Sequence, residues 1–90
     1  MTTQKIIARM KKDLLLQDMR YHLKQAKQDR QFMIGVSPHL QREVRFYHRR
    51  RESGNVNRMN RQLHNAKMKI ELADKFIAEI ENDIAELENS

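Results

Sequence analysis

The chain has 90 residues and a formal net charge of +6, with no cysteine, two glycines and one proline. This length allows a single domain over residues 1–90, and so few helix breakers predict an all-α chain of few, long helices. The composition excludes disulfides and thiolate chemistry, and no apolar run is long enough to cross a bilayer. Because the first residues also lack the apolar core of a secretory signal, we expect a cytoplasmic protein.

The first predicted helix covers residues 3–34 and begins at a threonine cap, Thr2 or Thr3. Its apolar residues form two stripes that differ in phase. The first stripe consists of Ile7, Met10 and Leu14, and the second consists of Leu16, Met19, Leu23, Ala26 and Met33, interrupted by Arg30. Such a change of phase is typical of a stutter or of a switch of packing partner. Gly35 follows, where it can adopt the left-handed conformation that ends a helix.

A short second helix is predicted over residues 38–52. Ser37 can act as its N-cap, and Pro38 stands in the first turn, where a missing N–H group costs nothing. Leu40, Val44 and Tyr47 lie on one side of this helix, which identifies Tyr47 as a core residue. The opposite side carries arginines, and the sequence Ser53-Gly54-Asn55 is expected to break the helix, with Asn55 capping the next one.

The third predicted helix, residues 55–88, carries the clearest pattern in the chain. Apolar residues fill every a and d position of a heptad repeat, which predicts coiled-coil packing against another helix. The a positions are Val56, Leu63, Ile70, Ile77 and Ile84, and the d positions are Met59, Ala66, Ala73, Ile80 and Leu87.

Charge favours an antiparallel hairpin of the first and third helices, with the short basic helix at its tip, over an up-down-up bundle. The hairpin sets the basic start of the chain beside the acidic residues 79–88. A second apolar stripe on the third helix, formed by Met68, Leu72 and Phe76, needs a cover in either arrangement. The second helix could cover it, in cis or swapped between chains, but we expect a homodimer built as a helical bundle.

The strongest functional signal is the run of arginines between residues 42 and 61, a stretch without lysine. The guanidinium fork suits bidentate contact with phosphate, and Phe46 can add stacking on bases. The alternative interpretation is a hydrated helix face whose arginines pair with acidic side chains. The residues expected to contact nucleic acid are Arg42, Arg45, Arg49, Arg50, Arg51, Arg58 and Arg61.

Patterns for catalysis, metal binding or a cofactor are missing from the sequence. The four histidines do not form an i, i+4 pair, and there is no glycine-rich phosphate loop. We therefore expect a non-enzymatic accessory or regulatory protein that binds nucleic acid, DNA or RNA, or a nucleoprotein complex. The alternative is an inhibitor or adaptor that docks a helix face or its arginine-rich tip on an acidic surface of a larger protein. A phage or mobile-element origin would suit either function, and a purely structural oligomeriser ranks third.

Overall fold

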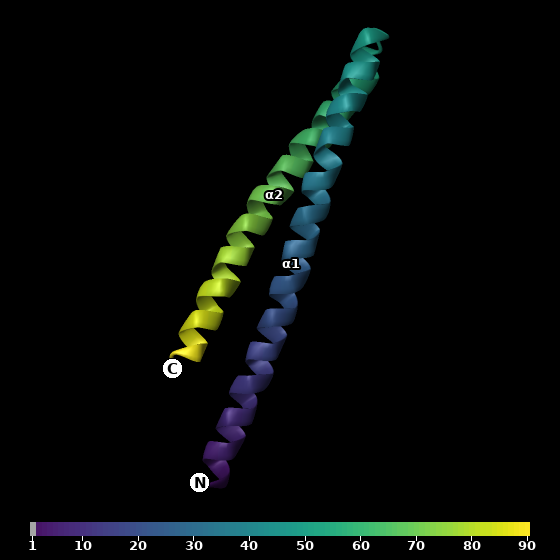
Figure 1. The fold of residues 1–90 in the computed structure, drawn as a ribbon. Coiled ribbons are helices and arrows are strands. Elements are labelled where there is room, and N and C mark those ends of the chain that lie inside the picture. Colours follow the sequence, from purple (N-terminus) through teal and green to yellow (C-terminus); the bar gives the residue numbers. More distant parts are fainter. Residues whose placement is uncertain (1) are drawn as a thin grey trace.

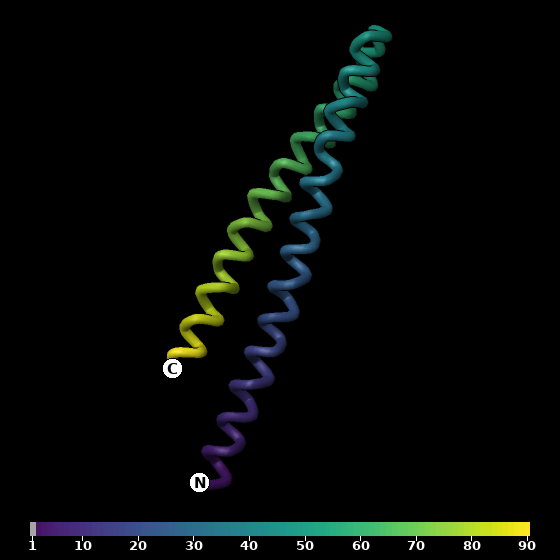
Figure 2. The backbone as a smooth tube through the Cα atoms, in the orientation of Figure 1, coloured from purple at the N-terminus to yellow at the C-terminus, as the bar shows by residue number. Residues whose placement is uncertain are grey.

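A computed structural model describes residues 2–90 as two long antiparallel helices packed along one side (Figure 1). Helix α1 spans Thr3–Arg49 and helix α2 spans Ser53–Glu88. The extents of 73 × 16 × 14 Å are those of a narrow rod, and the backbone reverses direction once, at the end distant from both termini (Figure 2). The predicted all-helical antiparallel hairpin is confirmed.

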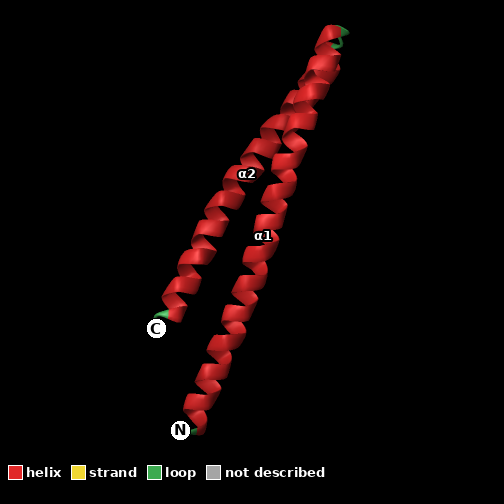
Figure 3. Cartoon of the chain, viewed as in Figure 1, coloured by secondary structure: helices red, strands yellow, loops and turns green. Residues whose placement is uncertain are grey.

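The predicted boundary between a first and a second helix is wrong. Helix α1 continues without interruption through Gly35, Ser37 and Pro38, so the short basic helix is the last part of α1 (Figure 3). The reason is the heptad phase of α1. The half-buried and buried positions of α1 continue from Met33 through Ser37 to Leu40 in steps of four and three, as they do elsewhere along the helix.

The helix can accommodate both residues that suggested a break. Gly35 does not have the positive φ expected of a helix-ending glycine. Pro38 is exposed, so the Ile34 carbonyl that loses its N–H partner can be hydrated instead. Ser37 donates its hydroxyl to the Met33 carbonyl at 3.0 Å, as serine does inside a helix rather than as an N-cap.

The interface between the helices holds two apolar clusters. Leu16, Ile80 and Ile84 form one near the chain ends, and Leu40, Met59 and Ala66 form the other near the turn. Tyr47 packs against the second cluster, as predicted. Between the clusters, Arg30 occupies a position facing α2 and forms an ion pair with Asp74. The core is thin: only seven side chains within residues 2–90 are buried, and none of them completely.

One flank of the hairpin is held by ion pairs that join the helices. Arg20 pairs with Glu88, and Lys27 lies 3.5 Å from Glu81. Lys12 donates to the backbone carbonyl of Ser90 at 3.0 Å, which places a cation at the negative end of the α2 dipole. The acidic end of the chain is therefore paired with α1, as predicted, but through Lys12, Arg20 and Lys27 instead of the basic residues at the start of the chain. Each exposed pair contributes little alone.

The N-terminal part of α1 extends beyond the end of α2 (Figure 1). We call residues 3–11 the overhang, because Lys12 is where α1 first contacts the C-terminal residue of the chain. Ile7, Met10 and Leu14, the first apolar stripe, are exposed. The predicted change of phase therefore marks the point where α1 turns its apolar face away from α2.

The helix ends follow the sequence in part. The Thr2 hydroxyl accepts a hydrogen bond from the Lys5 amide at 3.4 Å, as expected for a cap. Helix α2 begins at Ser53 instead of residue 55, after Glu52, so Asn55 does not cap it. Within residues 2–90, neither helix has a stretch long and apolar enough to cross a membrane.

Candidate nucleic-acid interface

A tight turn joins α1 to α2 and forms the tip of the hairpin. Arg51 has a φ of 58°, the left-handed conformation that usually falls to glycine at a helix C-terminus. The Arg51 amide bonds to the His48 carbonyl and the Glu52 amide to the Tyr47 carbonyl, both at 3.1 Å. This is the Schellman arrangement, and it lets α2 begin two residues after Arg51.

All seven arginines predicted as contacts lie on this tip and are exposed. Three belong to the last turns of α1, two to the connection between the helices and two to the first turns of α2. Within residues 2–90, Arg50 is the one member of the set found in an ion pair, with Glu52 at 3.8 Å. The alternative interpretation, in which acidic side chains neutralise the arginines, therefore finds little support inside this chain.

The arginines do not share one face. Arg42 follows the buried Leu40 by two positions, and Arg61 follows the buried Met59 by two positions. Two residues correspond to about 200° around a helix, so each arginine faces outward from the side of its helix opposite the partner. The tip thus carries positive charge on the outer faces of both helices, with Arg51 at the apex.

On the α1 side, an aromatic ring lies among the arginines. Arg42, Arg45 and Arg49 line a shallow groove together with Phe46. The Arg50 guanidinium lies 5.4 Å from the centre of the Phe46 ring, within cation–π range. Tyr47 meets Phe46 edge to face and supports it from the core side. Phe46 is half exposed, so a base could stack on this ring.

On the α2 side, polar residues that the sequence analysis did not single out lie beside Arg61. Asn57, Asn60 and His64 line a groove with this arginine. Their spacing of three and four residues, which places them on one face of a helix, was the available signal. Amide side chains can donate to phosphate oxygens and can bond to base edges.

The described residues lack the usual requirements for a metal site, since no three His, Asp or Glu side chains within residues 2–90 lie close enough together to hold an ion. What the tip offers is cationic hydrogen-bond donors, amides and one exposed ring.

Comparison with family models gave no match, and neither the curated proteins nor the solved structures contain a significant match to this chain.

Proposed function

We propose that this chain is a non-enzymatic accessory or regulatory protein that binds nucleic acid, or a nucleoprotein complex, through the arginine tip. The observation that carries the proposal is the set of seven exposed arginines around one turn, six of them outside any ion pair within residues 2–90. Affinity then comes mainly from neutralising phosphates and releasing counterions.

The shape of the tip favours contact with the backbone over reading of bases. A major groove about 12 Å wide accepts a single helix, whereas the hairpin is 16 × 14 Å in cross-section. Arginines on both outer faces can instead reach phosphates on two sides of the tip. Phe46 gives single-stranded nucleic acid an additional stacking contact that a duplex cannot use.

The test is binding to short duplex DNA, single-stranded DNA and RNA across a salt series. We compare the wild type with a variant in which Arg42, Arg45 and Arg49 are changed to Ala. The matched control changes Lys24, Lys67 and Lys75 to Ala, which removes the same charge from exposed positions away from the tip. If each arginine contacts one phosphate, the arginine variant should lower the slope of log K against log salt by roughly 3 on duplex DNA.

A loss of affinity in the arginine variant alone supports the proposal, whereas equal losses in both variants would reduce it to non-specific attraction. Absence of binding near physiological salt would contradict the proposal and favour the alternative function, an inhibitor or adaptor of a larger protein. The exposed apolar residues of the overhang, Ile6, Ile7 and Met10, favour that alternative as a docking helix.

The proposal also includes a homodimer and a cytoplasmic location. Twelve large apolar side chains are exposed within residues 2–90, and three of them, Phe32, Leu72 and Phe76, line one groove, the kind of apolar patch that marks an interaction site. The location rests on the composition of the chain.

A further inference from the structure

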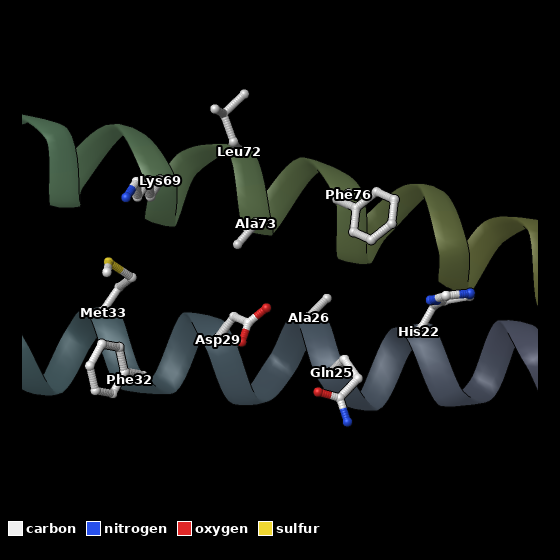
Figure 4. A pocket seen from close by; sticks show the side chains of 10 residues that line it. All are labelled: His22, Gln25, Ala26, Asp29, Phe32, Met33, Lys69, Leu72, Ala73 and Phe76. Atoms are coloured by element: carbon white, nitrogen blue, oxygen red, sulfur yellow. The ribbon is translucent and has the colours of Figure 1, made fainter.

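An open apolar groove runs along the flank of the hairpin opposite the ion pairs. Midway along its length lie Phe32 from α1 and Leu72 and Phe76 from α2, which are 67%, 61% and 50% exposed. Figure 4 looks onto this groove: Asp29 and Ala73 lie between the helices, Phe76 and Phe32 lie over the front of α2 and α1, and Leu72 points away from α1. We call this surface the groove flank.

Charge changes sign along the groove flank on α2. Arg58 lies two heptads before Leu72 and therefore on the same face, and Lys69 lines the groove itself. Beyond the apolar centre come Glu79 and Glu86, one and two heptads after Leu72, and Asp83. None of these five charged residues forms an ion pair within residues 2–90. The flank thus has a basic end, an apolar middle and an acidic end.

We infer that the groove flank is the interface of an antiparallel homodimer, with the two-fold axis passing near Leu72. Arg58 and Glu86 are each fourteen residues from Leu72, so this axis sets Arg58 of each copy level with Glu86 of the other copy. Leu72 meets its own symmetry mate, and Phe32 and Phe76 surround that contact. Asp29 and Lys69, which both line the groove, bring equal numbers of opposite charges to the centre.

A parallel dimer on the same flank is disfavoured. It would place Arg58 beside the partner copy's Arg58 and the acidic residues of both copies together, so like charges would meet at both ends. The antiparallel arrangement replaces both repulsions with attractions. It also sets the basic overhang of one copy near the arginine tip of the other. The repulsion between these positive regions weakens the dimer somewhat, but the arrangement concentrates positive charge at both ends.

The available area is sufficient for a stable interface. With the axis at Leu72, the turn of each copy lies about 21 residues away, so the overlap is about 60 Å at 1.5 Å per residue. A fully covered face about 15 Å wide then gives at most roughly 900 Å² per copy, compared with about 800 Å² in standard protein interfaces. Burial of this flank also supplies the second apolar layer that the thin core of the single hairpin lacks.

The arrangement has a consequence that rests on the proposed function. The turn lies at one end of a rod 73 Å long, so an antiparallel dimer carries its two arginine tips at opposite ends. In each tip Arg58 pairs with Glu86 of the other copy, and the other six arginines remain for nucleic acid. Such a dimer can bridge two nucleic-acid segments but cannot place both tips on one short site.

The first test is the mass of the protein in solution, measured by sedimentation and light scattering over micromolar concentrations. We expect twice the chain mass of 10.9 kDa. Changing Leu72 and Phe76 to Glu should weaken association at least about a hundredfold, because two apolar contacts become buried charges. Leu14→Glu is the control: this side chain is 64% exposed but does not line the groove, so its dimer should persist.

The second test separates antiparallel from parallel packing. Arg58→Glu and Glu86→Arg should each weaken the dimer by about tenfold, and the double variant should recover most of the loss. In a parallel dimer each single variant would exchange one like-charge pair for another, so neither single variant would weaken the dimer. Circular dichroism checks that every variant stays helical, and if the glutamates lower helicity, Leu72 and Phe76 are changed to Ala instead.

The dimer and the nucleic-acid binding can fail independently. A monomer at all concentrations that still binds nucleic acid overturns the dimer and leaves the proposed function in place. A dimer that fails to bind nucleic acid overturns the proposed function and leaves the dimer in place. A dimer that survives the Leu72 and Phe76 changes would show that another surface holds it together, and would overturn the assignment of the groove flank.

Discussion

At the scale of single residues, a substitution at Gly35 tests whether α1 is one continuous helix. It stands inside the helix without a positive φ, and a Cβ added there would have no neighbour within 4 Å. Gly35→Ala should therefore raise the free energy of unfolding by about 0.5–1 kcal/mol, because alanine has less backbone entropy to lose. Urea denaturation followed by circular dichroism measures this change. A loss of stability would mean that Gly35 ends a helix after all.

Arg51, unlike Gly35, adopts a backbone conformation that favours glycine. Its left-handed conformation is unfavourable for a residue with a Cβ, so Arg51→Gly should stabilise the turn by about 1 kcal/mol while removing one charge from the tip. Arg51→Ala, the control, removes the same charge without relieving the backbone. If Arg51 contacts phosphate, both variants should bind nucleic acid more weakly although one of them is more stable than the wild type.

At the scale of the element, Pro38 distinguishes a continuous helix from a broken one. A proline inside a helix costs about 3 kcal/mol relative to alanine, whereas a proline in the first turn costs almost nothing. Because Pro38 is an exposed interior residue of α1, Pro38→Ala should raise the free energy of unfolding by up to about 3 kcal/mol. The same denaturation experiment checks it, and an unchanged midpoint would favour the separate short helix.

The core of the hairpin allows a second comparison at this scale. Leu40 is buried against Met59, whereas Phe32 is exposed on the same helix. Leu40→Ala should lower the free energy of unfolding by about 2–5 kcal/mol, and Phe32→Ala should change that of the single hairpin by less than about 0.5 kcal/mol. Measurement at protein concentrations that keep the chain monomeric separates this effect from dimerisation. Equal losses would contradict the assignment of the interface between the helices.

The sequence was sufficient to predict α2 and the hairpin, because ten consecutive heptad positions and opposite terminal charges agree with each other. It misled at Gly35 and Pro38, where local turn chemistry outweighed a longer-range pattern. Met33, Leu40 and Tyr47 keep the same heptad position across that segment, and this phase was the better indicator of one helix. The arginines of the tip could be identified from the sequence as candidate phosphate contacts. Their division between two outer faces could not, because it depends on how α1 and α2 pack.

At the scale of the whole molecule, stability depends on the apolar surface that the contact between α1 and α2 leaves exposed. A two-helix rod with seven buried side chains among its described residues has little core to hold it together alone. If a second copy covers the groove flank, folding and association are coupled and the melting temperature depends on protein concentration. We expect a rise of a few degrees for each tenfold increase in concentration.

The variant with Leu72 and Phe76 changed to Glu should melt at a lower temperature and lose this concentration dependence, because its side chains disrupt association rather than the contact between α1 and α2. Leu14→Glu should keep the dependence of the wild type. A melting temperature of the wild type that stays constant over a hundredfold range of concentration would mean that the hairpin is stable by itself. The exposed residues of the groove flank would then have to be explained by a different partner.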